Sequence, residues 1–400
     1  MTGTTITMPE HAFDPEFRHD PTRRRLTAGG LPDGHALMRF GPLSEARSLT
    51  VRQYVLDMGA DASVLAPDTG SLFVLGHLLV QGDEADEIVV DGTTGRVFSM
   101  WLFDKHPESA EVFPLAPSVD ALARFLSAVD DFTALRGDFA DLVGRTGPEV
   151  VEEATARLLS VFTDEEWGDG GWGAAGDPQE WDHAVPAFWR IAALIRPLAL
   201  IAAPGDGLRL DLPKGLLDEE FGPGEVVRMA PADLPAALEH EPTRRFLTEV
   251  GLPQDGLMFE LWRDDYLLQT LPEREETGED GGERLPAGAE WLVCLGSLVH
   301  DFEALIDGRT GQVHYREYHS DTVTPVNADI STLAFTVWMH SREQTLDKEH
   351  DFTDDFYDCL ADTMAAALAS VDPVACLPAA SPDDYRYWPE VFHDEAGGVL

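Results

Sequence analysis

The sequence predicts two tandem globular domains, each with helices and an antiparallel hairpin, and an internal repeat is the main observation behind this prediction. The segment 19–32 returns as the segment 240–253 with identical residues at 10 of 14 positions. Three further echoes follow in the same order: 72–76 with 292–296, 90–97 with 306–313, and 114–122 with 325–333. The distance between partners falls from 221 to 211 residues, far longer than the repeat of about 20 to 50 residues in solenoids. We therefore expect the duplication of a whole domain.

Length and composition agree with this organisation. A chain of 400 residues fits two domains of roughly 100 to 200 residues each, and 44% hydrophobic content is ordinary for domains that bury a core. The second copy is expected to begin with a helix and a strand within 210–229, which the first copy shortens to 5–17. The boundary is therefore predicted at about residue 205, giving domains of residues 1–205 and 206–400.

Each copy is predicted to open with a short helix of about nine residues. Asp20 and Glu241 are placed at the N-cap, and the proline that follows each of them suits the first helical position because its φ is fixed. Gly30 and Gly251 lie just past the predicted ends, where glycine is favoured. The paired arginines inside each helix are expected on an exposed or half-exposed side, in solvent or, as the alternative, against a partner.

Strands and hairpins follow. Consecutive apolar residues at 72–75 and 291–295 predict central strands that are buried on both faces. The sequences DGTTG at 91–95 and DGRTG at 307–311 each join two β-prone runs, which is typical of a hairpin turn. A calcium loop is the rejected alternative, because the alternating acidic ligands and the closing glutamate are missing.

The remaining predicted elements are helices. One begins at 117–118 in the first copy, and its counterpart is capped by Asn327 or Asp329. Apolar residues at helical spacing predict closing helices at 148–162 and 354–369, with packing faces rather than sites.

The search for catalytic and metal-binding patterns assigns none. The glycine-rich segment 167–173 has no β-rich run before it and no G-K-[ST] after it, so we expect a surface loop rather than a nucleotide loop. His314, His319 and Asp321 carry metal-ligand atoms, but the corresponding segment 98–104 offers a single carboxylate. We therefore predict no metal at these residues.

Two further features favour structural roles. Asp354 and Asp358 share one helix face at i,i+4, where acid/base chemistry is conceivable, but the acidic composition favours a solvated face. The three cysteines contain no C-x-x-C pair and are expected to be buried thiols. No catalytic residue, cofactor or metal is predicted, and the chain is not expected to be an enzyme.

The net charge of −45, from 73 acidic and 28 basic residues, restricts the partners. Nucleic acid and anionic membranes attract clustered Lys and Arg, so both are excluded as expected partners. A basic protein partner and a purely solubilising surface remain the alternatives. The N-terminus has no signal-peptide pattern, and charged residues interrupt the apolar stretch 185–204. We therefore expect a soluble cytoplasmic protein.

The repeated motifs resemble a known family. The sequence PTRRFLTEVGLP at 242–253, followed by LVCLG at 292, DGRTG at 307 and the helix start at Asn327, is similar to the fourth subfamily of the SUKH superfamily. Those proteins are bacterial immunity proteins linked with polymorphic toxin systems. The resemblance covers about residues 207–395, and the first copy looks like a divergent relative. It implies an α+β fold in each half, with a mostly antiparallel sheet flanked by helices, and function by binding rather than catalysis.

The leading hypothesis that follows from the resemblance is an intracellular immunity protein. It would bind and neutralise a cognate toxin, expected to be a basic nuclease or nucleic-acid deaminase whose basic face suits an acidic partner. Glu317, Tyr318 and Asp321, which follow the second hairpin where the copies differ most, are the predicted contacts. The alternative is an acidic cytoplasmic scaffold or regulator that binds a host protein without any toxin. The toxin's identity, the number of binding domains and the oligomeric state stay open.

Overall fold

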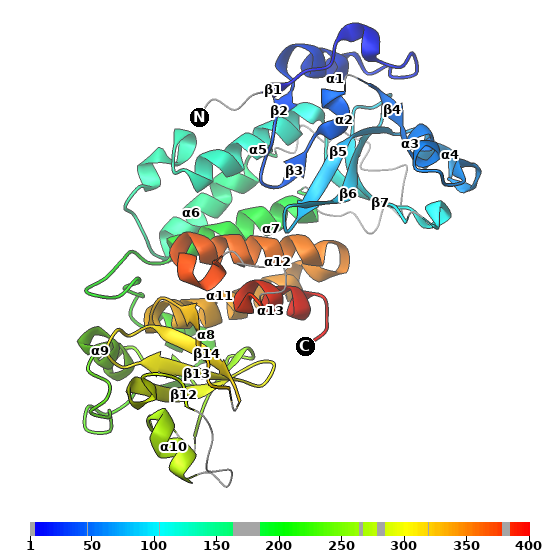
Figure 1. The fold of residues 1–400 in the computed structure, drawn as a ribbon. Helices are drawn as coiled ribbons and strands as arrows, with labels where there is room; N and C mark the ends of the chain where they lie inside the picture. The colour runs from blue at the N-terminus through cyan, green and yellow to red at the C-terminus, as the bar shows by residue number, and fades with distance from the viewer. Residues whose placement is uncertain are drawn as a thin grey trace. The chain divides into compact units, whose positions relative to one another are not determined.

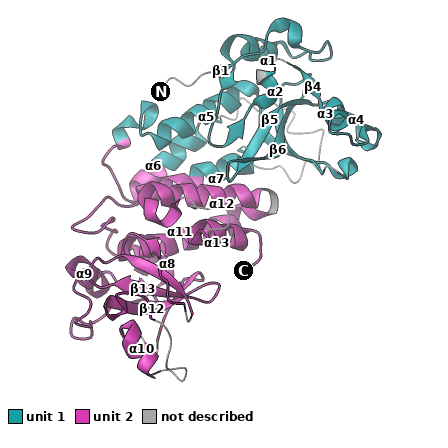
Figure 2. Cartoon of the chain, viewed as in Figure 1, with its two compact units in different colours: residues 1–141, 154–193 teal, residues 142–153, 194–400 magenta. Residues whose placement is uncertain are grey.

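The computed structural model describes residues 5–45, 47–103, 105–162, 185–263, 267–277, 285–318, 320–377 and 385–400. The chain forms two compact units, one of residues 1–141 and 154–193 and the other of residues 142–153 and 194–400 (Figure 2). The domain boundary at about residue 205 stays a prediction. The glycine-rich segment 167–173 lies outside the described residues.

The first unit is built on an antiparallel sheet. Its strands run in the order β3 (Met38–Arg39), β5 (Phe73–Val80), β6 (Asp83–Val90), β7 (Val97–Trp101) and β8 (Glu111–Ala116), and β4 (Leu49–Thr50) also pairs with β5. The strand β1 (Thr5–Ile6) pairs separately with β2 (Leu31–Pro32). The predicted strand at 72–75 is therefore an interior strand, as expected.

Helices complete this half of the chain. They are η1 (Glu10–Ala12), α1 (Asp20–Arg24), η2 (Arg25–Gly29), α2 (Gly41–Ser44), α3 (Val51–Asp57), η3 (Ala62–Val64), α4 (Pro67–Gly70), η4 (Pro107–Ser109), α5 (Val119–Thr133), η5 (Gly137–Leu142), α6 (Pro148–Leu159) and α7 (Ala187–Ile195). Ser118 caps α5 by accepting a hydrogen bond from the Ala121 amide at 3.1 Å. The Phe125 ring of α5 lies 3.8 Å, centroid to centroid, from the Trp189 ring of α7, which fixes these two helices in one apolar core.

The second unit repeats the sheet. Its strands follow chain order: β11 (Phe259–Leu261), β12 (Leu292–Leu298), β13 (Phe302–Asp307), β14 (Val313–Glu317) and β15 (Thr324–Asn327), all antiparallel. The strand β9 (Val226–Val227) pairs with β10 (Leu252–Pro253), as β1 pairs with β2. In Figure 1, α10 (Leu271–Thr277) lies on one face of this sheet, and α11 (Ile330–His350) and α13 (Tyr387–Ala396) lie on the other.

The other helices of this half are η7 (Arg196–Leu200), α8 (Leu216–Phe221), α9 (Glu241–Glu249), η8 (Ala289–Trp291), α12 (Phe352–Val371) and η9 (Pro373–Cys376). None of the helices in the described ranges has an apolar stretch long enough to cross a bilayer. The two halves thus confirm the predicted α+β class, with mostly antiparallel sheets flanked by helices.

A shared irregularity shows that the two sheets are copies. In each, a β-bulge lies at the residue before a glycine: at Leu75, before Gly76, in the pairing of β5 with β6, and at Leu295, before Gly296, in the pairing of β12 with β13. A Cβ atom at Gly76 would lie 2.1 Å from the Arg39 carbonyl oxygen, and one at Gly296 would lie 2.0 Å from that of Glu260. Glycine is therefore required by the close approach of the neighbouring strand.

The most similar segments of the two copies contact each other within each copy. The His19 amide donates to the Gly92 carbonyl at 2.7 Å, and the His240 amide donates to the Gly308 carbonyl at the same distance. The helices α1 and α9 are thereby held against the hairpin turns that follow them by about 70 residues in sequence. The two repeated motifs therefore contact each other in the same way in both copies.

The predicted helix start is wrong by one residue. The N-caps are His19 and His240, whose carbonyls accept from the amides of Arg23 and Arg244 at 3.1 Å, so Asp20 and Glu241 are the first helical residues. At the first helical position, the negative charges of Asp20 and Glu241 interact favourably with the positive end of the helix dipole. They do not act as N-caps. In the first copy the helix also continues as a π-helical turn, η2.

The second predicted helix start is resolved in favour of Asp329. Its carboxylate accepts from the amides of Ser331 and Thr332, which forms a capping box. Asn327 is instead buried in the core, where its side chain donates to Asp372 at 3.2 Å and accepts from the Trp388 indole at 3.1 Å. The single asparagine of the chain therefore joins β15 to η9 and α13.

Candidate functional site

The predicted contact residues lie at the end of β14 and in the loop that leads to β15. Glu317 and Asp321 are exposed, and the Tyr318 side chain is 39% exposed, which is high for an aromatic residue. His319, one of the three residues with metal-ligand atoms in this segment, lies outside the described residues. An acidic and aromatic segment is thus presented to solvent at one end of the sheet.

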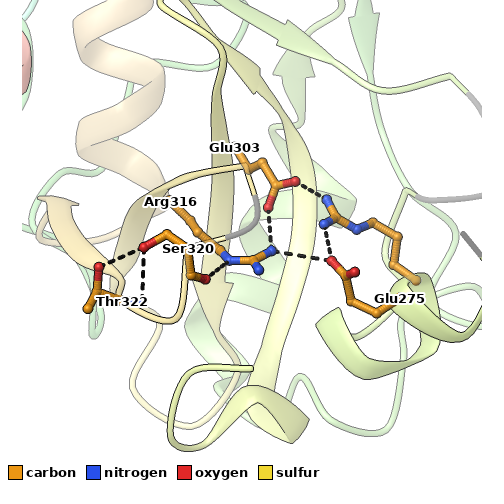
Figure 3. A network of polar contacts seen from close by, with 6 residues as sticks. Glu275, Glu303, Arg316, Ser320 and Thr322 are labelled. Carbon is orange, nitrogen blue, oxygen red and sulfur yellow. Dashed lines mark hydrogen bonds and ion pairs between the residues drawn. The ribbon is translucent and has the colours of Figure 1, made fainter. Parts of the chain in front are cut away.

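Arg316 stabilises the loop between β14 and β15 through a hydrogen bond to Ser320. Its Nε donates to the Ser320 carbonyl at 2.7 Å, and the Ser320 hydroxyl lies 2.9 Å from that of Thr322 (Figure 3). The Ser320 amide also donates to the Glu317 carbonyl at 3.1 Å. These bonds hold Ser320, a described residue of this loop, to the last residues of β14.

Arg316 belongs to a network of four charged side chains. Its Nη1 donates to Glu303 of β13 at 3.1 Å and to Glu275 of α10 at 3.3 Å (Figure 3). Arg274 of α10 binds the same two carboxylates. The side chains of Arg316 and Glu303 are fully buried, and the two positive and two negative charges balance.

The ion pairs of the network shift the pKa values of Arg274 and Glu275 toward their charged forms. Burial alone would lower the pKa of Arg274, but its bonds to Glu303 and Glu275 outweigh burial and raise it. Burial would raise the pKa of Glu275, and the two arginines outweigh that effect and lower it. Arg274 and Glu275 are therefore both charged at neutral pH, as their ion pair requires.

A cysteine beside the network is chemically inert. Cys294 of β12 is buried, and burial raises the pKa of its thiol to about 12. Thiolates and not thiols act as nucleophiles, so Cys294 is a core residue. The prediction of three buried thiols is wrong for Cys359 and Cys376, which are only half-buried, although burial also raises the pKa of the Cys376 thiol to about 12.

The first copy presents different side chains at the same place. Glu87 pairs with Met100 across β6 and β7 as Glu303 pairs with Arg316 across β13 and β14. Met100 packs in an apolar cluster with Val89 and Phe98, so an apolar side chain stands where the second copy has Arg316.

That segment carries two exposed aromatic residues. Trp101, at the position of Glu317, is 48% exposed, and Phe103 is 37% exposed, with their ring centroids 4.3 Å apart. In the sequence, 98–104 is the counterpart of the segment that contains His314, His319 and Asp321, and it offers a single carboxylate as a metal ligand. Aromatic enrichment was the signal that was missed, since exposed Trp and Phe are typical of interfaces.

The other residues considered from sequence have structural surroundings. His314 lies within the sheet, burial lowers the pKa of its imidazole, and its Nδ1 makes no hydrogen bond among the described residues. Asp358 is partly exposed and also lies 3.3 Å from His393, whose other ring nitrogen is 3.0 Å from Asp362. The side chain of Asp354 lies outside the described part of the chain.

The chain thus consists of two duplicated α+β halves, each with an antiparallel sheet flanked by helices. The chain belongs to the SUKH-4 immunity protein family, whose model matches residues 1–164 and 212–394. The two matched ranges confirm the resemblance and the tandem duplication. No curated protein and no solved structure matches the chain.

Proposed function

We propose that the chain protects its cell by binding a cognate toxin protein and blocking it, without catalysis of its own. The observation that carries this proposal is family membership over both copies. A net charge of −45 adds to it, because enzymes that act on nucleic acid have basic faces that an acidic protein can occupy. A basic nuclease or nucleic-acid deaminase is therefore the proposed toxin, and neither nucleic acid nor a membrane is a proposed partner.

The loop after β14 is the proposed contact in the second copy. Glu317 and Asp321 supply negative charge, and Tyr318 supplies an exposed ring. Because Arg316 already holds the Ser320 carbonyl, little backbone entropy is lost when a partner binds. Charges at such a rim act mostly on the association rate, which falls as salt screens them.

The aromatic pair Trp101 and Phe103 is the proposed contact in the first copy. Large exposed rings bury much area at low entropic cost and often dominate the affinity of an interface. The two copies would then contribute differently, one through charge and the other through apolar area.

The experiment tests each toxin-like domain encoded next to the gene for this chain, in a catalytically inactive form for binding and in an active form for a growth-rescue assay. Wild-type chain is expected to form a stoichiometric complex whose association slows steeply with salt, and to restore growth. The double reversal Glu317→Lys with Asp321→Lys should slow association by at least about tenfold, a barrier change of about 1.4 kcal/mol.

The matched control reverses two exposed acidic residues elsewhere in the same unit, Glu225→Lys with Asp233→Lys. It makes the same change in net charge, so general charge effects appear equally in both variants. Equal slowing in the two variants would remove the loop from the interface. Failure of the wild-type chain to bind or neutralise the neighbouring toxin, with capture of a host protein instead, would favour the scaffold alternative.

A further inference from the structure

Three titratable side chains converge between α11 and α13 in the second unit. His340 and Glu343 lie three residues apart on α11, and Glu395 comes from α13. The His340 Nε2 atom is 3.6 Å from a Glu395 oxygen and 3.9 Å from a Glu343 oxygen. One ligand atom from each residue lies within 4.8 Å of the other two.

The cluster is buried and its bonding is incomplete. His340 is 1% exposed and Glu343 is 3% exposed. The buried Nε2 atom of His340 makes no hydrogen bond within the described ranges. Burial, together with the charges of Glu395 and Asp347, raises the pKa of Glu343 to about 9. Two carboxyl groups and an imidazole nitrogen thus face one another, with His340 and Glu343 buried and the Glu395 side chain 21% exposed.

Other buried charges in this unit are satisfied differently. The carboxylates of Glu275 and Glu303 are bound by two arginines. His393 is flanked by a separate aspartate at each ring nitrogen. The cluster around His340 differs from both, because a single ring nitrogen faces two carboxyl groups at distances longer than a hydrogen bond.

We infer that His340, Glu343 and Glu395 form a binding site for one divalent transition-metal ion such as Zn²⁺. Metal–nitrogen and metal–oxygen bonds of about 2.0 to 2.2 Å place neighbouring ligand atoms of a tetrahedral site about 3.4 Å apart. The two separations from the His340 nitrogen, 3.6 and 3.9 Å, are close to this value. All three ligand atoms lie within 4.8 Å of one another, so binding an ion would draw the two carboxylates closer together. A histidine and a carboxylate three residues apart on one helix are also a recurrent ligand spacing in helical metalloproteins.

The surroundings support this assignment. The Gln344 amide donates to the other oxygen of Glu395 at 3.2 Å, an outer contact of the kind that orients a metal-bound carboxylate. One imidazole and two carboxylates suit zinc, manganese or cobalt better than calcium, which takes six to eight oxygen ligands. Since the ligands come from two helices, the ion would join α13 to α11 and stabilise this end of the unit.

The test measures metal content and thermal stability of the full chain. The chain is stripped with a chelator and dialysed against ZnCl₂, MnCl₂, CoCl₂ or CaCl₂ in separate samples, and bound metal is determined by mass spectrometry. One Zn²⁺, Mn²⁺ or Co²⁺ per chain is expected, with a rise in Tm on metal addition. His340→Gln, Glu343→Gln and Glu395→Gln should each weaken binding by at least about tenfold and abolish the rise in Tm.

Glu343→Gln is the decisive variant, because glutamine has nearly the shape of glutamic acid and removes the carboxylate ligand without leaving a cavity, so the variant should fold without metal. The control is His300→Gln, which removes a half-exposed histidine that lies 3.0 Å from Asp394. It should keep full binding. Failure to bind any of the three transition metals would overturn the site, and so would binding that survives both His340→Gln and Glu343→Gln.

Discussion

Replacing Arg316 with methionine should destabilise the second unit by about 3 to 5 kcal/mol, the usual cost of removing one partner from a buried ion pair. Arg316 and Glu303 are both fully buried, so water cannot replace the lost guanidinium. Glu303 would keep only Arg274, which Glu275 shares. The same change removes the bond from Nε to the Ser320 carbonyl and frees the loop that carries the proposed contacts.

For a unit of roughly 200 residues, this loss corresponds to a fall in Tm of about 6 to 20 °C. Thermal unfolding followed by circular dichroism measures the shift. Hydrogen exchange followed by mass spectrometry should place the lost protection in β13 to β15 and the loop after β14. Toxin association should also slow, because the loop would no longer be ordered before binding.

The double variant Glu303→Leu with Arg316→Met provides the control. It removes one negative and one positive charge together and leaves Arg274 paired with Glu275. Apolar replacement of a whole buried pair is often neutral or stabilising, so the double variant should be more stable than Arg316→Met alone. Unchanged stability of the single variant, or a double variant that loses the sum of the two single losses, would refute the role assigned to the network.

Three further predictions concern the second unit. Gly296→Ala should cost about 1 to 3 kcal/mol, since its Cβ would lie 2.0 Å from the Glu260 carbonyl oxygen; urea unfolding measures it. Asp329→Ala should cost a similar amount, because the helix cap and the acceptor for the Arg209 amide at 2.6 Å are both lost. His314→Phe, which installs the residue type of the first copy, should reduce acid sensitivity. Burial lowers the pKa of His314 in the folded chain. The neutral imidazole therefore contributes its full share of the unfolding free energy above the unfolded pKa of about 6.5, and this share is lost as the pH falls through the folded pKa. The gap in unfolding free energy between His314→Phe and wild type should therefore widen from pH 7 to pH 5.

Each of these predictions has its own check. Gly41→Ala adds a Cβ in open space and should be nearly neutral, so an equal loss there would dismiss the steric argument at Gly296. Asp329→Asn keeps one acceptor oxygen and should lose less than Asp329→Ala. Parallel pH profiles of wild type and His314→Phe would show that this histidine does not contribute to acid unfolding.

The elements that the sequence predicted well depend on local chemistry. The interior strands, both DG-x-TG hairpins, and the helices begun by Ser118 and Asp329 follow from apolar periodicity, glycine in turns and capping side chains. The one-residue error at the first helix arose because proline and an acidic residue are compatible with adjacent N-terminal positions. The His19 carbonyl decides the start, and it is placed by the docking of His19 on the Gly92 turn.

The site was predictable only in part. Divergence between the copies predicts contacts at Glu317, Tyr318 and Asp321. These residues lie at the end of β14 and in the loop where Arg316 binds the Ser320 carbonyl. The ion pair between Arg274 and Glu303 could not be predicted from their spacing, because they lie 29 residues apart in the chain.

By itself, the sequence determined that the chain is a duplication, that each copy has an α+β fold of a known family, and that its surface is strongly acidic. These properties are carried by residue order and composition, which need no contact between distant segments. Only the tertiary structure decided that Arg316 sits in a buried network, that Trp101 and Phe103 are exposed, and that His340 and Glu343 face Glu395. Burial and convergence depend on how separate helices and strands pack, and packing brings together residues whose separation along the chain carries no signal.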